Sequence, residues 1–520
     1  MNEDYIRSKF RSNTGNTSRY NQDSDIIEYK QVKSKIRDRV SILIDDYSKN
    51  KTYDSESYDN FVMEAIESYV SESPRVRGYI SDNGVLETER LKSALIADFI
   101  KHGKIQPALD SDDISEIQIN DFNSIWIEKN GVKEPYTDST TGKRIVFADM
   151  EEYEHFVNGI LLEDNKKLNE NAPLIDAITK DGFRVAVQGS SATVADKSGN
   201  HMYKPINVTI RKQRQKNFSS KELVETGCMS NNMAKLLEII PVAKLTTFIG
   251  GATSSGKTVI LQVLADNCPD DMRIAALGNP AELKLRRRIE FGDETGVMRN
   301  NVVHLEAKEY TVSEKTPKEF PTIENCARAN LRLTPDVIIY EEIRSKDEFE
   351  FTADAAQTGH FFLTSLHAKD VDGLLSRYVT QYIAATQGID RDTAISILAE
   401  FLSLIIIRKK MPDNTRKISE IAEIVGTTYD EHGKLQFDVN MIYEFVRDKE
   451  VLDRNEQGSI SRKSLKRKVH GRHKRVGKIS TRLYKELIDS GFDDASIEFL
   501  TKPVSDSEVE VYEYTPLFYD

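Results

Sequence analysis

The sequence predicts an α/β protein whose second half carries a mainly parallel sheet with helices on both faces. Between about residues 223 and 451, short apolar segments alternate with helical stretches, as expected for strands joined by crossover helices. The chain has 520 residues, more than one ordinary core accommodates, so we expect several domains. The segments predicted as strands are residues 245–249, 273–277, 336–340, 361–366 and 403–407.

A smaller α+β domain is predicted ahead of this sheet, over residues 86–211. It combines a helical stretch from Leu91 to His102 with alternating segments at 116–120 and 124–128. Further upstream, apolar residues at helical spacing predict two amphipathic helices within residues 26–85. These helices form an N-terminal extension that packs on the chain or docks a partner.

The remaining boundaries follow from composition. Residues 1–25 are polar and rich in serine and asparagine, which predicts disorder. Residues 212–222 are charged and poor in apolar residues, which is typical of a linker. The composition of residues 452–520 predicts a C-terminal tail that is first basic and then acidic.

Composition excludes several classes of protein. Three separated cysteines without a CxxC pair exclude a disulfide framework and a four-cysteine zinc site. A net charge of -12 argues against a whole surface built for nucleic acid. The N-terminus lacks the apolar stretch of a secretory signal, and the apolar run at 401–407 is too short to span a bilayer. We therefore expect a cytoplasmic protein.

Residues 251–258 read GATSSGKT and match the phosphate-loop pattern GxxxxGK[ST]. A predicted strand precedes this loop and a predicted helix, 258–266, follows it, which is the context that the pattern requires. Backbone N–H groups at the helix start would face phosphate oxygens, Lys257 would reach the β and γ phosphates, and Thr258 would bind Mg²⁺. The sequence therefore predicts binding of ATP with Mg²⁺ by Gly251, Ala252, Thr253, Ser254, Ser255, Gly256, Lys257 and Thr258.

Two further strand ends carry candidate catalytic residues. The apolar segment 336–340 ends in Glu341-Glu342, and Glu342 is the candidate for polarising the attacking water. A solvated acidic strand end is the alternative interpretation. His367 follows the segment 361–366, where the carboxyl ends of strands face ligands in such folds, although the residue taken alone fits a structural histidine better.

Together these segments resemble the secretion ATPases of the type II/type IV superfamily, and most closely the VirB11-like branch that includes the CpaF (TadA-type) pilus ATPases. The resemblance covers about residues 90–447. It rests on the phosphate loop and on four further segments, namely Ala276–Leu283 at the family's acidic box, Leu331–Arg344, Thr358-Gly359-His360 and Thr364–Ala368.

The resemblance implies a RecA-like motor domain over residues 223–451 behind the α+β domain, assembled as a hexameric ring that binds nucleotide between the two domains. It also implies catalytic roles for Glu282 in the acidic box and for Arg184 and Arg211, which would approach the phosphates. For both arginines, ordinary salt bridges at the surface are the alternative.

Three departures from the family pattern bear on the rate of hydrolysis. Gly278-Asn279 replace the usual Glu-Asp of the acidic box, and Glu341 stands where glycine is usual. Ser254 adds a Cβ where the family normally has glycine. We therefore expect ATP binding with slow hydrolysis.

The leading functional hypothesis is a motor at the inner face of the membrane that energises type IV secretion, conjugation or type IV/Tad pilus assembly. It would act with an inner-membrane platform or a secretion-channel protein. One alternative is a ring subunit that binds ATP without hydrolysing it. Another is a RecA-like nucleic-acid motor, because the basic segment 461–478 could contact DNA, or else anionic lipid, unless it is only a solvated linker.

Overall fold

The computed structural model forms two compact units, Met1–Gln215 and Lys216–Asp520, which we describe separately. The division between them falls inside the segment 212–222 assigned to the linker. Residues 1–25, expected to be disordered, and residues 461–468 of the basic segment lie outside the described residues. The structure describes residues 27–48, 55–72, 75–81, 85–99, 102–139, 141–164, 166–198, 201–212, 217–291, 295–307, 321–448, 469–505 and 508–518.

The first unit is built on a sheet of six antiparallel strands. Its strands are β1 (Ile114–Asp121), β2 (Ser124–Lys129), β3 (Val132–Pro135), β4 (Leu174–Ile178), β5 (Arg184–Gln188) and β8 (Asn207–Arg211). Their order is β3-β2-β1-β8-β5-β4. Alternate residues such as Ile117 and Ile119 are buried, and their core includes side chains of α6 (Met150–Leu162). The short α5 (Gln106–Asp110) and the hairpin β6 (Asp196–Ser198) and β7 (His201–Tyr203) complete the domain.

The helices ahead of this sheet form a small core of their own. They are α2 (Tyr29–Ser48), α3 (Ser55–Ser71) and α4 (Thr88–Phe99). Ile36, Ile66 and Leu91 are fully buried among them. An ion pair of 3.0 Å between Lys33 and Glu152 ties α2 to α6. None of the described helices has the long apolar stretch that spanning a bilayer requires.

The second unit holds a nine-stranded sheet with the order β11-β10-β12-β13-β9-β14-β15-β16-β17. The strands from β11 to β14 are parallel, and they include all five strands that the sequence predicts. Antiparallel pairing extends the sheet through β15, β16 and β17. The bounds are β9 (Thr247–Gly250), β10 (Ile274–Gly278), β11 (Val302–Glu306), β12 (Val337–Tyr340), β13 (Phe361–Leu366), β14 (Leu404–Lys410), β15 (Arg416–Tyr429), β16 (Leu435–Arg447) and β17 (Gly471–Arg475).

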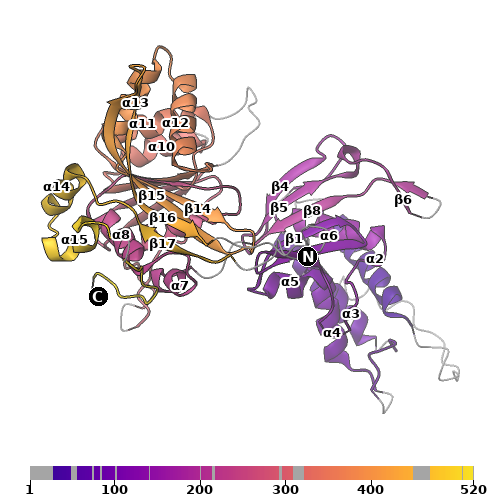
Figure 1. The fold of residues 1–520 in the computed structure, drawn as a ribbon. Helices are drawn as coiled ribbons and strands as arrows, with labels where there is room; N and C mark the ends of the chain where they lie inside the picture. The colour runs from indigo at the N-terminus through magenta and orange to yellow at the C-terminus, as the bar shows by residue number, and fades with distance from the viewer. Residues whose placement is uncertain are drawn as a thin grey trace, which may run out of the picture. The chain divides into compact units, whose positions relative to one another are not determined.

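Helices cover both faces of this sheet (Figure 1). One core joins the strands to α8 (Asn231–Val242) and α9 (Lys257–Asp266), and the other joins them to α10 (Ile323–Leu331), α11 (Lys346–Gln357), α12 (Val371–Ala385) and α13 (Arg391–Phe401). Neighbouring residues of one strand enter opposite cores, as Phe248 and Ile249 do. This layered arrangement confirms the predicted α/β fold class.

The C-terminal segment folds onto the first of these cores, in contrast to the tail expected from its composition. α14 (Thr481–Asp489) buries Leu483 and Leu487, and α15 (Asp494–Thr501) buries Ile497 and Leu500. Their spacings of four and three residues place each pair on one helix face. α7 (Ser220–Glu225) contributes to the same core.

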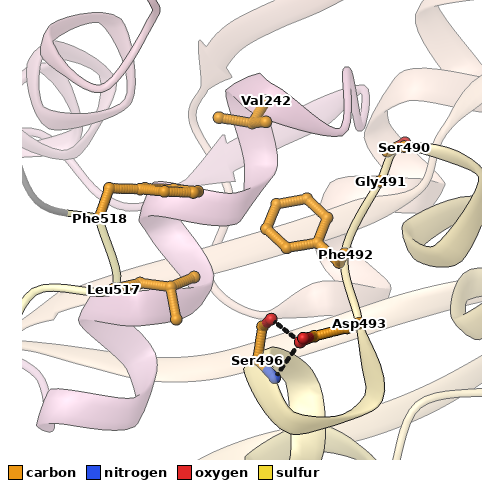
Figure 2. Close-up of a pocket in the computed structure, with 8 residues that line it drawn as sticks. All are labelled: Val242, Ser490, Gly491, Phe492, Asp493, Ser496, Leu517 and Phe518. Carbon is orange, nitrogen blue, oxygen red and sulfur yellow. Dashed lines mark hydrogen bonds between the residues drawn. The ribbon is translucent and has the colours of Figure 1, made fainter.

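Two further observations describe how the C-terminal segment packs within the second unit. Arg475 on β17 is buried and donates to Glu508 at 2.8 Å, so this cation of the basic segment is not at the surface. Beside α8, a pocket of about 350 Å³ brings Phe492 and Phe518 together (Figure 2). None of the described residues that line this pocket is a lysine or arginine, so it is not suited to a phosphate.

Candidate functional site

The phosphate loop joins β9 to α9 with the backbone that its glycines allow. Gly256 precedes the helix in the left-handed region, at φ 88°. A Cβ on Gly251 would overlap the Ser255 hydroxyl, so the loop can close only around glycine. Residues 252–254 are exposed, and Ser254 has φ 60°, which costs a residue with a Cβ about 1 kcal/mol or more.

Lys257, the first residue of α9, is 8% exposed and meets two of the predicted catalytic residues. Its Nζ lies 3.2 Å from His367 Nδ1 and 3.8 Å from Glu342 Oε1. His367 follows β13 and Glu342 lies just beyond β12. Because β9, β13 and β12 are adjacent and parallel, their carboxyl ends meet at one edge of the sheet. The fold therefore brings all three side chains together.

The charges of this cluster fix its protonation. Burial acts to raise the pKa of Glu342, but the hydrogen bond from Arg344 and the charge of Lys257 outweigh it and leave that pKa lowered. Burial and the nearby Lys257 lower the pKa of His367. At neutral pH the carboxylate is therefore ionised and the imidazole is neutral. His367 Nε2 lies 2.8 Å from Glu342 Oε1, although this oxygen has no hydrogen-bond partner among the described residues.

A second group of oxygen atoms lies one helical position further on. The Thr258 hydroxyl donates to Glu282 Oε2 at 3.2 Å. Glu282 belongs to the segment that follows β10, so a fourth strand end contributes to the site. A hydroxyl next to a carboxylate offers the oxygen ligands that Mg²⁺ prefers.

Two arginines that the sequence did not single out support the loop. Arg408, at 4% exposure, donates to the Gly256 carbonyl, and Arg416 donates to the Ser254 carbonyl at 3.1 Å. They come from β14 and β15, more than 150 residues along the chain from the loop. Because no local motif marks them, only the pairing of β14 with β9 could have revealed them.

The two arginines of the first unit are brought together by the sheet. Arg184 on β5 and Arg211 on β8 are paired directly across neighbouring strands. Two like charges in such a pair repel each other, so an anion beside them would be stabilising. Glu116 on β1 is the next residue across from Arg211.

The motif Thr358-Gly359-His360 lies away from this cluster. It precedes β13, whereas His367 follows the same six-residue strand, so about 23 Å of extended chain separate His360 from His367. His360 Nδ1 lies 2.9 Å from the Thr358 hydroxyl and 3.2 Å from the Ala355 carbonyl. His360 therefore contributes to the turn at the amino ends of the strands.

Several known proteins are similar to this chain. A putative conjugal transfer protein of Mycobacterium tuberculosis (strain CDC 1551 / Oshkosh) is 23% identical over 326 residues, which cover 62% of this chain and 83% of that protein. The type IV secretion system protein VirB11 of Brucella suis biovar 1 is 23% identical over 351 residues, covering 61% and 87%.

Among solved structures, the Legionella pneumophila ATPase DotB is similar with a TM-score of 0.43 and 21% identity, over 59% of this chain and 76% of that one. Residues 201–482 match the family described as "Type II/IV secretion system protein". This confirms the resemblance at the level of the superfamily, and the closer likeness to the CpaF branch stays a prediction. The chain belongs to the type II/IV secretion system protein family.

Proposed function

We propose that the protein binds and hydrolyses ATP at the loop 251–258. The observation that carries this proposal is the meeting of Lys257, Glu342 and His367 at the carboxyl ends of three neighbouring strands. A cation for phosphate and an ionised carboxylate for water activation then lie within one small site.

The residues present suit ATP and Mg²⁺. Ser255 Oγ is buried and, within the described part of the chain, has no hydrogen-bond partner, so the loop retains an unused donor. Lys257 and the start of α9 offer positive charge to phosphate oxygens. Thr258 and Glu282 would hold Mg²⁺, which supplies charge neutralisation at the phosphates when bound.

Each residue then has a defined task. Lys257 binds the phosphates, and Glu342 orients and polarises the attacking water. His367 contacts both side chains and keeps the carboxylate in place. Arg344 holds the other oxygen of Glu342 at 2.6 Å, which keeps the carboxylate ionised.

Arg184 and Arg211 are proposed to stabilise charge on the phosphates in the assembled ring. Their direct pairing on neighbouring strands supports this role, because it places two cations side by side. Arginine fingers contribute on the order of 10³ to 10⁵ in rate. An R184A/R211A variant should therefore lose hydrolysis by about that factor, while its first unit keeps the unfolding temperature of the wild type.

The cellular task proposed is that of a homo-hexameric motor, cytoplasmic and peripheral at the inner membrane face. It would energise type IV secretion, conjugation or type IV/Tad pilus assembly with an inner-membrane platform or channel protein. The conjugal transfer and VirB11 relatives support this class of process. Hydrolysis is proposed to be slow, below about 1 s⁻¹, because Ser254 and Asn279 depart from the family pattern.

Binding of a fluorescent ATP analogue to the purified full chain tests the site. Lys257→Ala should weaken binding by at least about a hundredfold, because a charged contact to phosphate is worth about 3 kcal/mol. Lys221→Ala removes an exposed lysine and should leave binding unchanged. Equal affinity of Lys257→Ala and the wild type would refute the proposal.

A test in cells separates a motor from a ring subunit that only binds ATP. If hydrolysis drives the process, Glu342→Gln and Lys257→Ala should both abolish it. If Glu342→Gln retains the process and Lys257→Ala loses it, binding alone is sufficient, and the alternative of a structural ring subunit is correct.

A further inference from the structure

Glu341 is turned into the protein, unlike a solvated residue at an acidic strand end. It is 6% exposed. Its Oε2 accepts from the backbone N–H of Glu282 at 2.5 Å, and its Oε1 accepts from that of Leu283 at 3.3 Å. His304 Nε2 lies 2.8 Å from the same Oε1. A buried carboxylate with this many donors is a strong anchor for the backbone that it binds.

The segment after β10 is held at four consecutive amides by side-chain acceptors. Glu306 accepts from Ala281 at 3.1 Å, and Gln262 accepts from Lys284 at 2.8 Å. Glu341 binds the two amides between them. Glu341 therefore holds the middle of the segment 281–284, whose first amide is bound by β11 and whose last amide is bound by α9.

The central residue of this segment is Glu282, whose carboxylate accepts from Thr258. Displacement of the Glu282 backbone would move its carboxylate away from the hydroxyl proposed to bind Mg²⁺. Geometry within the site depends on such supporting contacts, and their loss typically costs 10- to 100-fold in metal affinity or activity.

Gly278 makes the position of Glu341 possible. Leu277 pairs with Tyr340 across the parallel strands, so residues 278 and 341 follow side by side. A Cβ on Gly278 would lie 2.8 Å from Glu341 Oε1 and closer still to the Ala281 backbone. Position 278 therefore has no room for a side chain between the Ala281 backbone and Glu341.

We propose that Glu341 is a positioning residue that holds Glu282 at Thr258. The proposal rests on the proposed ATP hydrolysis.

Steady-state hydrolysis by the purified full chain, measured against Mg²⁺ concentration at fixed ATP, tests this role. Glu341→Gln keeps the side-chain volume but presents an N–H₂ group to one of the donors. We expect the maximal rate or the apparent Mg²⁺ affinity to fall about 10- to 100-fold. ATP affinity without Mg²⁺ should stay within about twofold, which a general loss of structure would not allow. Glu324→Gln, an exposed carboxylate on α10, is the matched control.

A substitution at position 278 gives a second readout. Gly278→Glu should lower the rate further than Glu341→Gln, because its Cβ would collide with the Ala281 backbone as well as with Glu341 and so displace the segment that carries Glu282. Thermal unfolding checks that the variants fold. If the wild type hydrolyses ATP and Glu341→Gln matches it in rate and Mg²⁺ dependence, the inference is wrong. A wild type that hydrolyses no ATP refutes the proposed function itself.

Discussion

Replacement of Glu342 by glutamine should separate ATP binding from hydrolysis. In the wild type the Glu342 carboxylate lies 3.8 Å from Lys257 Nζ, so it competes with a phosphate for the same cation. At an effective dielectric constant of about 20, this attraction amounts to about 4 kcal/mol. Arg344 and His367 also hold the carboxylate, and solvation returns part of the energy. If the substitution frees Lys257 from about one third of this attraction, about 1.4 kcal/mol, the variant should bind ATP about tenfold more tightly than the wild type.

The same substitution removes the group proposed to activate water. The maximal rate should therefore fall about 10²- to 10⁴-fold. Calorimetric titration with Mg-ATP measures the affinity, and phosphate release measures the rate. Weaker ATP binding by Glu342→Gln than by the wild type would refute the competition between Glu342 and phosphate for Lys257. An unchanged rate of phosphate release would refute the catalytic role of Glu342.

Three further predictions concern the second unit. Burial and the charge of Lys417 lower the pKa of His473 to about 4, so below pH 6.5 the unfolded chain takes up a proton that the folded chain does not. The free energy of unfolding should fall by about 3 kcal/mol between pH 6.5 and 4 and then level off. Urea denaturation at several pH values should show that His473→Gln loses this pH dependence, whereas the variant His432→Gln, changed at an exposed histidine, keeps it. Arg408→Gln should weaken ATP binding about tenfold in calorimetry, because it removes a buried cation from the Gly256 carbonyl; unchanged affinity would count against this bracing role. Arg475→Ala should destabilise the unit by about 3 kcal/mol in urea, since the Lys502 and Pro503 carbonyls lose their donor and Glu508 keeps only Lys502 as a cationic partner, whereas a loss below about 1 kcal/mol would contradict the pairing.

The parts of the site that the sequence predicts are those marked by short-range patterns. The pattern of the loop 251–258 is sufficient by itself to predict phosphate binding. The apolar strands that end before Glu342 and His367 place both residues at one edge of the sheet. Parallel strand order then brings them to Lys257 without further information.

The remaining parts depend on contacts between distant segments. Arg408 and Glu341 act through backbone groups far along the chain, and no spacing rule reveals such partners. Glu341 and Glu342 are adjacent acids, yet one is buried as an anchor and the other faces Lys257, because neighbouring residues at a strand end point in opposite directions.

The C-terminal segment shows how composition can hide a pattern. Its many charges suggest a tail, but Leu483, Leu487, Ile497 and Leu500 recur at helical spacing behind the N-cap residues Ser480 and Asp493. Two short helices are therefore stabilised by the core of the larger unit rather than by their own length.

Phosphate release from Mg-ATP by the purified full chain is the decisive measurement for ATP hydrolysis at this site. We expect slow but measurable release that Lys257→Ala abolishes and Lys221→Ala leaves intact. Release that persists at the wild-type rate in Lys257→Ala, or no release by a folded wild type that binds ATP, would contradict it.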